Sequence, residues 1–212
     1  MVNKKLKGFE DIYSKPHNAA WTYSQIPKDL SNLIKNKTII PPGRVLEVGC
    51  GEGYSAIFLA KLGFEVTAID RSKNAIKFAK QNAITQEVTA TFKVQEYSLI
   101  NSYKEKFDFI FDWRFLHEII DENERDEYIR SVSKLLKPKG KYLSVAFSGN
   151  FNFMGSGKLR KSPVGIDIYF STLEESKDLI GKYLLILDSK IITVLQKPNL
   201  KIKANYILAQ KA

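Results

Sequence analysis

The sequence predicts a doubly wound α/β fold with a seven-stranded sheet, mostly parallel and closed by a C-terminal antiparallel hairpin. Short apolar runs alternate with amphipathic segments through the middle of the chain, which is the pattern of parallel strands joined by crossover helices. The first of these apolar runs leads directly into a glycine-rich turn. The last two runs are separated by Lys197-Pro198-Asn199, a turn too short for a crossover helix.

The first half of the chain holds three of the expected strands. A helix over 27–36 precedes them, because Pro27 suits a first helical turn and Leu30 and Leu33 lie on one face. Ser72 is a suitable N-cap for a later helix. We expect strands at 44–48, 64–69 and 89–94, with helices at 54–62 and 72–82 between them.

The second half continues the alternation. An almost wholly apolar run predicts a fourth strand over 107–111, and Pro138 and Gly140 end the helix that follows it. The segment 148–162 is rich in Gly, Ser and Lys and predicts a mobile surface loop, a candidate lid. The remaining predicted elements are a helix at 124–136, a strand at 141–147, a helix at 172–180 and strands at 183–195 and 202–210.

Length and composition predict one globular domain over 1–212. Hydrophobic residues make up 44% of the chain and charged residues 26%, which suits a folded protein with one core. No apolar run approaches the ~20 residues of a membrane helix, and 1–7 lacks an apolar signal core, so we expect a cytoplasmic protein with no membrane partner. One cysteine and two histidines argue against a disulfide or a metal site.

The formal net charge of +10 permits a nucleic-acid partner without favouring one. Small lysine groups occur at 4–7, 134–141 and 158–161, but most lysines are scattered along the chain. Scattered lysines are typical of a solvated surface, and no basic stretch is interleaved with aromatic residues. A nucleic-acid partner is therefore possible but not favoured.

The strongest functional signal is the glycine turn after the first strand, which reads Val48-Gly49-Cys50-Gly51-Glu52-Gly53. Glycines at alternate positions remove Cβ atoms where a ligand must lie against the backbone. Asp70 closes the second strand 21 residues after Gly49, where a carboxylate can accept hydrogen bonds from both hydroxyls of a ribose. A nucleotide-like ligand is expected at this edge of the sheet.

The spacing of the turn favours S-adenosylmethionine over NAD. The turn has Gly-x-Gly-x-Gly in place of the dinucleotide Gly-x-Gly-x-x-Gly, and Glu47 stands two residues before its first glycine. An acid at this position would repel a pyrophosphate and attract an ammonium group. S-adenosylmethionine carries an ammonium group and no phosphate.

The stretch 45–53 resembles motif I of class I S-adenosylmethionine-dependent methyltransferases, whose fold is a Rossmann-like seven-stranded sheet. The stretch 106–112 is similar to the motif of that family whose final acid faces the methyl group. The stretch 135–141 is similar to its Leu-Lys-Pro-Gly-Gly motif, with Lys139 in place of the first glycine. The resemblance implies S-adenosylmethionine as cofactor and S-adenosylhomocysteine as product. It implies a cofactor site made of Trp21, Glu47, Gly49, Cys50, Gly51, Gly53, Asp70, Arg71, Glu96, Tyr97, Asp112 and Trp113.

Several of these residues have a second interpretation. Glu47 either faces the cofactor or orients the loop backbone, and Glu96 either borders the adenine or is an ordinary acid at a strand end. Cys50 reads as a small filler of the turn rather than a nucleophile. Asp112 and His117 are the candidate catalytic residues, His117 as a general base or as a packed histidine.

The run 112–119 loosely resembles the thiopurine and tellurite-resistance type methyltransferases, which act on small molecules. Trp21 looks like the lead-in of that subset, which implies that N-terminal lead-in helices within 1–40 cover the cofactor site. The subset often has Arg directly after the motif acid, whereas here Trp113 intervenes before Arg114. Trp113 also stands where enzymes that methylate amino groups of nucleic acids have the first proline of Pro-Pro, which argues against base N-methylation.

Three functions remain open from the sequence. The first is methyl transfer to a sulfur, nitrogen or oxygen of a small molecule, by a monomer or a homodimer. The second is methylation of RNA or protein through the basic surface, and the third is a domain that binds S-adenosylmethionine without turnover. The first is favoured by the candidate lid and by a set of aromatic residues suited to an apolar pocket, Trp21, Tyr23, Trp113, Phe115, Phe151 and Phe153.

Overall fold

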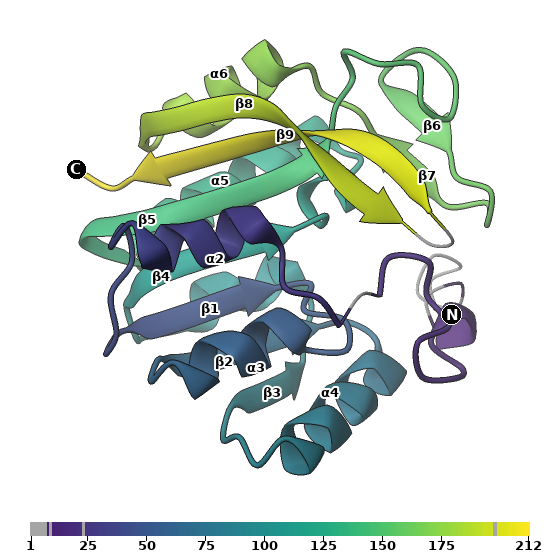
Figure 1. Cartoon of the computed structure of the whole chain (residues 1–212). Coiled ribbons are helices and arrows are strands. Elements are labelled where there is room, and N and C mark those ends of the chain that lie inside the picture. Colours follow the sequence, from purple (N-terminus) through teal and green to yellow (C-terminus); the bar gives the residue numbers. More distant parts are fainter. Residues whose placement is uncertain (1–7, 9, 23, 197–198) are drawn as a thin grey trace.

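A seven-stranded sheet forms the centre of the computed structural model, which describes residues 8, 10–22, 24–196 and 199–212 (Figure 1). The strand order is β3-β2-β1-β4-β5-β9-β8. Strands β1 to β5 pair in parallel, and β9 runs antiparallel to both of its neighbours. The strands are β1 (Arg44–Val48), β2 (Glu65–Asp70), β3 (Thr91–Val94), β4 (Phe107–Trp113), β5 (Leu136–Phe147), β8 (Leu185–Gln196) and β9 (Leu200–Gln210).

This topology confirms the predicted doubly wound sheet with its C-terminal antiparallel hairpin. Two residues of the predicted hairpin turn, Lys197 and Pro198, lie outside the described residues, as do the lysines of 4–7 and Tyr23. The strand order reverses between β1 and β4, and a sheet of this kind binds ligands beyond the carboxyl ends of its strands at that point. The fold therefore places the expected site after Val48 and Trp113.

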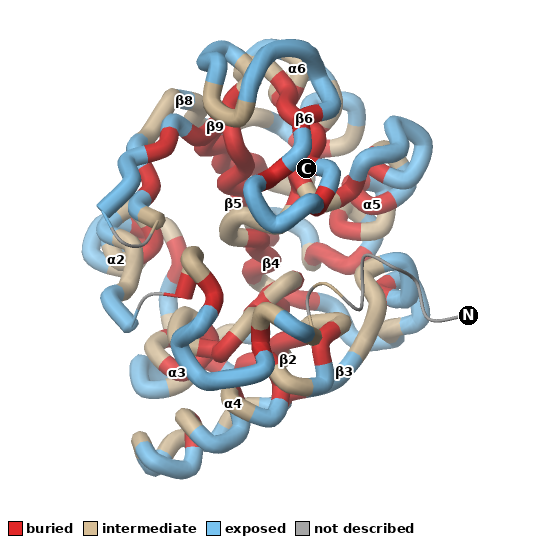
Figure 2. The backbone as a smooth tube through the Cα atoms, turned by 90° about the vertical axis from the view of Figure 1, so that its right-hand side faces the viewer, coloured by how far each residue is buried: buried red, intermediate tan, exposed pale blue. Residues whose placement is uncertain are grey.

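In the described part of the chain, the α-helices α2 to α6 cover the two faces of the sheet (Figure 1). The buried residues of three helices pack in one core cluster with Phe109 and Phe111, and those of the other two pack in a second cluster with Ile110 and Tyr142. Figure 2 shows buried strands between helices whose outer surfaces are exposed. The first group is α2 (Lys28–Lys35), α3 (Tyr54–Lys61) and α4 (Lys73–Thr85), and the second is α5 (Glu122–Leu135) and α6 (Leu173–Gly181).

Side-chain caps mark the starts of α4 and α5. The Ser72 hydroxyl accepts the backbone N–H of Ala75 at 3.0 Å, as its position in the sequence predicts. Asp121 accepts the N–H groups of Asn123 and Glu124, so α5 begins at Glu122, two residues earlier than predicted. Of the described helices, none is both long and apolar enough to cross a membrane.

The strand β5 is longer than predicted. It begins at Leu136, which pairs with Phe107, although the expected strand begins at Lys141. The register between β4 and β5 shifts between Phe107 and Phe109, and this irregularity accommodates Pro138 and Gly140 within the strand. Two short 3₁₀ helices were not predicted, η1 (Tyr97–Ser102) and η2 (Leu116–Glu118), which follow β3 and β4.

The predicted loop over 148–162 is wrong at its end, where β6 (Leu159–Lys161) pairs with β7 (Asp167–Tyr169) in a separate antiparallel hairpin. The preceding part is tied together by the buried guanidinium of Arg160. This group donates hydrogen bonds to the carbonyl oxygens of Phe151 at 2.5 Å, and of Phe153 and Gly157 at 2.8 Å. One side chain thus satisfies three main-chain acceptors of a segment that has little regular structure.

Candidate functional site

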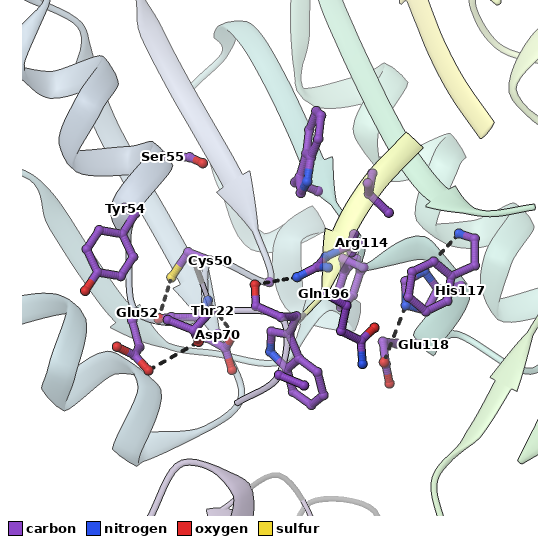
Figure 3. A pocket seen from close by; sticks show the side chains of 18 of the residues that line it. Thr22, Cys50, Glu52, Tyr54, Ser55, Asp70, Arg114, His117, Glu118 and Gln196 are labelled. Atoms are coloured by element: carbon purple, nitrogen blue, oxygen red, sulfur yellow. Dashed lines mark hydrogen bonds and ion pairs between the residues drawn. The ribbon is translucent and has the colours of Figure 1, made fainter. Parts of the chain in front are cut away.

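A cavity of about 780 Å³ lies at the carboxyl ends of the parallel strands (Figure 3). Its walls include Val48 at the end of β1, Asp70 at the end of β2 and Trp113 at the end of β4. This is the switch point of the sheet, where the topology predicts a ligand. The volume is in the range of small-molecule and cofactor sites.

The first two glycines of the turn let the chain approach the cavity closely. Both have positive φ angles, +74° at Gly49 and +52° at Gly51, and both line the cavity. A Cβ atom at Gly49 would lie 2.7 Å from Phe115, and one at Gly51 would lie 2.9 Å from the hydroxyl of Tyr13. Side chains at either position would clash, so the turn requires glycine for space as well as for backbone conformation.

The third glycine serves packing and does not line the cavity. A Cβ atom at Gly53, where φ is +78°, would lie 2.7 Å from the ring of Phe92 and 2.9 Å from the Cβ of Ala79. These contacts allow α3 to begin directly against α4 and β3. The resemblance placed Gly53 at the cofactor, and the structure instead places it behind the turn.

Asp70 holds the turn and borders the cavity at the same time. Its two carboxylate oxygens accept the backbone N–H groups of Gly51 and Ser72, each at 2.9 Å. Burial raises the pKa of Asp70, and these two hydrogen bonds oppose that shift. Each oxygen keeps a further lone pair with which it can accept a hydrogen bond from a ligand.

Arg71 and Tyr97 also line the cavity, whereas Glu96 does not. The guanidinium of Arg71 forms an ion pair with Glu96 at 2.9 Å, so Glu96 positions Arg71 from outside the cavity. The hydroxyl of Tyr97 donates a hydrogen bond to Glu124 at 2.6 Å, which fixes the ring at the cavity wall. Gln95, which the sequence did not single out, lines the cavity next to them.

Glu47 supplies a buried acid at the cavity wall. The residue is 4% exposed, and its oxygen Oε2 has no hydrogen-bond partner among the described residues. Burial raises the pKa of Glu47 to about 8, against a hydrogen bond from the backbone of Ala56 that lowers it. A cationic ligand group beside this oxygen would stabilise the carboxylate and satisfy its free acceptor.

The N-terminal segment crosses the cavity above the glycine turn. The indole N–H of Trp21 donates to the hydroxyl of Tyr13 at 2.7 Å, and both residues line the cavity. Glu52 accepts the backbone N–H of His17 at 2.8 Å and the hydroxyl of Thr22 at 3.2 Å. These contacts anchor 10–22 on the turn, a region where the sequence pointed only to Trp21.

A second anchor of this segment is Arg114. It has a positive φ angle of 64° and lines the cavity. Its guanidinium donates to the carbonyl of Trp21 and, at 2.8 Å, to the carbonyl of Leu195 at the end of β8. Arg114 therefore joins the N-terminal segment to the C-terminal hairpin across the cavity (Figure 3).

The expectation that Asp112 faces the reacting methyl group does not fit the structure. Its carboxylate is fully buried on the other face of the sheet, where it accepts the hydroxyls of Tyr128 at 3.1 Å, Ser144 at 2.9 Å and Tyr142. Burial raises its pKa to about 6, and the three hydroxyl hydrogen bonds oppose this. Because β4 continues to Trp113, strand alternation directs Trp113 to the cavity and Asp112 away from it.

His117 lines the cavity, but its partners restrict its role as a base. Its Nδ1 accepts the backbone N–H of Phe147 at 3.3 Å, and the two rings stack 4.1 Å apart. A neutral imidazole with this partner carries its proton on Nε2, which lies 3.7 Å from Oε1 of Glu118. His117 therefore acts as a hydrogen-bond donor on the side of Glu118 rather than as a base, and Glu118 is the nearby acid that can accept a proton.

Cys50 also lines the cavity, and its environment makes the thiol inert. The side chain is buried, and this burial raises the pKa of the thiol well above its ordinary value. The residue thus fills space in the turn. Among the described residues no cluster of His, Cys, Asp and Glu side chains could hold a metal ion.

The aromatic residues singled out from the sequence separate into two groups. Trp21, Trp113 and Phe115 line the cavity. Phe153 packs against Phe147 and Phe170 in the core instead, and Phe151 is exposed. Other polar cavity residues were not singled out from the sequence, because their positions follow from the packing of distant segments rather than from spacing; they include Tyr13, Glu52, Gln95, Glu118 and Gln196.

Comparison with known proteins points to methyl transfer. A family model described as a methyltransferase domain matches residues 41–180. The chain is 30% identical over 153 residues to the ubiquinone biosynthesis O-methyltransferase of Coxiella burnetii, an alignment that covers 70% of the chain and 63% of that relative. The chain thus spans less than two thirds of the relative's length.

Two solved structures share the fold over almost the whole chain. One is 1,6-didemethyltoxoflavin-N1-methyltransferase of Burkholderia thailandensis, with bound 1,6-didemethyltoxoflavin and S-adenosylhomocysteine. It has a TM-score of 0.75 and 18% identity, covering 97% of this chain and 86% of its own. The other is TehB from Haemophilus influenzae, with a TM-score of 0.71 and 22% identity over 96% of this chain and 67% of its own.

Proposed function

Because the chain belongs to the methyltransferase-domain family, we propose that it transfers a methyl group from S-adenosylmethionine to a sulfur, nitrogen or oxygen of a small molecule. The product of the cofactor is S-adenosylhomocysteine. The observation that carries the proposal is the buried, unpartnered oxygen of Glu47 beside the turn of Gly49 and Gly51. An ammonium group suits this oxygen, and a pyrophosphate would be repelled by it.

The donor would be held by residues from four segments. The donor would lie against the backbone of Gly49 and Gly51, which line the cavity, and the free lone pairs of Asp70 suit two ribose hydroxyls. Arg71 and Tyr97 form the wall beyond Asp70, as expected for the adenine side. When bound, S-adenosylmethionine supplies a methyl group already activated by its sulfonium, so alignment and exclusion of water are the main tasks of the protein.

The N-terminal segment is proposed to exclude water from the reaction. Residues 10–22 carry Tyr13 and Trp21 over the turn, and Arg114 ties them to β8. Water excluded in this way would strengthen the attraction between Glu47 and the ammonium group. The proposal treats 1–212 as one domain in which this segment acts as a cover.

The size and the largely apolar lining of the cavity favour a small acceptor over a macromolecule. Beyond the donor region the walls include Trp113, Phe147 and Met154, a pocket suited to a compact and partly apolar molecule. The curated relative and the toxoflavin enzyme are named for reactions on small molecules, which supports this choice. In this proposal His117 orients the acceptor, and Asp112 stabilises the carboxyl end of β4 from the opposite face. A cytoplasmic location and a monomer or homodimer complete the proposal.

Calorimetry with S-adenosylmethionine, S-adenosylhomocysteine and NAD tests the donor. We expect micromolar affinity for the first two and no heat with NAD. Glu47→Gln should weaken binding, whereas Glu65→Gln, on the exposed start of β2, should not. Binding of NAD without S-adenosylmethionine would refute the assignment.

Labelled S-adenosylmethionine then tests the acceptor class. Small thiols, phenols and amines should take up label, and bulk RNA and protein should not. If only RNA became labelled, and the labelling fell steeply with salt concentration, methylation of RNA through the basic surface would be favoured instead. Cofactor binding with no transfer to any class would favour a binding domain without turnover.

A further inference from the structure

The outer part of the cavity has a polar end and an apolar rim. We infer that the acceptor is an amphipathic molecule with a protic head group, either a hydroxyl or a ring N–H, and an apolar tail. The head lies among His117, Glu118 and Gln196, and the tail leaves past Val164, Leu195 and Leu200. This inference rests on the proposed methyl transfer and names the acceptor of the same site.

The polar end holds one buried acceptor that requires a hydrogen-bond donor. The amide oxygen of Gln196 is buried and has no hydrogen-bond partner among the described residues. Glu118 contributes a carboxylate that is 20% exposed, and His117 contributes its Nε2–H. Figure 3 shows these three side chains together on the side of the cavity away from Asp70. A head group with a proton on oxygen or nitrogen can donate to the buried Gln196 oxygen, whereas an apolar or anionic group would leave that oxygen without a partner.

Apolar side chains also line this cavity. Trp113 and Phe147 follow from the ends of β4 and β5, and Met154, Ile168 and Val194 extend the same surface. Rings and aliphatic side chains at these positions suit the flat body of an aromatic or heteroaromatic head group. The head would then present its nucleophilic atom toward the donor, with its proton toward Glu118.

The rim is apolar and open to solvent. Val164 is 58% exposed, Leu195 46% and Leu200 44%, yet all three line the cavity. They come from the β6–β7 loop, the end of β8 and the start of β9, and Gln196 pairs with Leu200 in the hairpin. The rim therefore continues directly from the polar end, so a tail attached to the head can cover these exposed side chains.

The transfer balances without any further reactant. The head-group oxygen or nitrogen forms a bond to the methyl carbon while the bond between that carbon and the sulfonium sulfur breaks, and its electrons leave the sulfur neutral. The proton of the head group passes to the Glu118 carboxylate and then to water. Glu118 is thus the proton acceptor, and His117 is a positioning residue.

A chain-length series tests the tail. Phenol, 4-butylphenol and 4-octylphenol are titrated into the protein loaded with S-adenosylhomocysteine, and binding is followed by tryptophan fluorescence. We expect 4-octylphenol to bind at least about 30-fold more tightly than phenol, because burial of only two or three of its methylene groups at about 0.8 kcal/mol each gives this gain. Val164→Asp and Leu200→Asp should remove most of this gain. Ile84→Asp, at an exposed apolar residue of α4 outside the cavity, should leave it unchanged.

Loss of S-adenosylhomocysteine binding would refute the proposed function itself. Normal binding of S-adenosylhomocysteine with no gain from the alkyl chain, or an equal loss in Ile84→Asp, would overturn only the apolar tail. The two failures are therefore distinguishable.

Acceptor acidity tests the role of Glu118. Glu118→Gln should bind S-adenosylhomocysteine normally but methylate 4-octylphenol about 100-fold more slowly, a typical contribution of a general base. With 2-nitro-4-octylphenol, assayed above the pKa of that phenol so that it is ionised before it binds, the variant should approach the rate of the unmodified protein. An equal loss with both phenols, or no loss with either, would overturn the assignment of Glu118 as proton acceptor.

Discussion

The carboxylate of Asp70 accepts the backbone N–H of Gly51 at 2.9 Å, so the residue expected at the ribose also holds the glycine turn in place. Its other oxygen accepts the N–H of Ser72 at the start of α4. The end of β2, the turn and α4 are thereby coupled through one side chain. Complete removal of the carboxylate would therefore change both the affinity for the ligand and the free energy of unfolding.

Asp70→Ala should weaken S-adenosylmethionine binding by ~2–4 kcal/mol and also lower the free energy of unfolding by ~1–3 kcal/mol. The second effect arises because two backbone N–H groups lose their acceptor. Calorimetry and urea unfolding measure the two quantities. Glu65→Ala, at the exposed start of the same strand, should change either by less than ~0.5 kcal/mol. A stable Asp70→Ala protein with unchanged affinity would remove Asp70 from the site.

The affinity for S-adenosylmethionine should rise with pH. Below about pH 8 the free protein carries a proton on Glu47, and a complex with a cationic ligand releases it. The association constant should increase by up to about tenfold per pH unit from about pH 6 upward, and this increase should level off above about pH 8. Titration calorimetry in two buffers of different ionisation enthalpy measures both the affinity and the released proton.

Glu47→Gln is the control for this pH dependence. It keeps the shape of the side chain and cannot ionise, so the slope that remains belongs to other groups. A slope shared by both proteins would show that Glu47 does not meet the ammonium group.

Gly53→Ala should destabilise the fold by ~2–4 kcal/mol, because the new methyl group would overlap Phe92 and Ala79 at a positive φ angle. Gly155→Ala is a matched control, with φ of +103° and no atom within 4 Å of its Cβ position, and should cost only ~1–2 kcal/mol. Chemical denaturation measures the difference. Equal losses would mean that backbone strain alone requires glycine at position 53.

Arg160→Met should release the segment 149–157 and lower the free energy of unfolding by ~2–4 kcal/mol, because three main-chain carbonyls lose a buried charged donor. Hydrogen exchange should accelerate in β6 and its surroundings while β1 to β5 remain protected. Lys161→Met, at the exposed neighbour paired with Asp167, is the control. Unchanged exchange in Arg160→Met would show that the segment keeps its shape by other means.

Local patterns were sufficient to predict the sheet. Apolar runs separated by capped helices located β1 to β5, and the short turn after Gln196 indicated the antiparallel hairpin. The glycine spacing and Glu47 pointed to the correct family because the backbone conformation and close packing of this turn require glycine at fixed positions. Patterns of this kind involve residues that are close in the sequence, so they can be recognised without knowledge of the three-dimensional structure.

The side-chain directions at the site required the structure. Ending β4 at Phe111 in the prediction left Asp112 free to face the cavity, whereas two further strand residues reverse its direction. Glu118 and Gln196 meet at the cavity only because η2 and the β8–β9 hairpin converge, and no local pattern encodes that approach. The anchors of the cover, Arg114 and Glu52, likewise depend on contacts between distant segments.

Arg160 donates hydrogen bonds to main-chain carbonyl groups between Gly149 and Gly157, and every amino acid has such a carbonyl group. The acceptors are main-chain oxygens on either side of position 154, so these hydrogen bonds do not depend on the side chain at that position. Met154 is the member of this segment that reaches the cavity. A library randomised at position 154 should alter which acceptors are methylated while the scaffold stays intact, which makes this wall a natural starting point for changing the enzyme's selectivity.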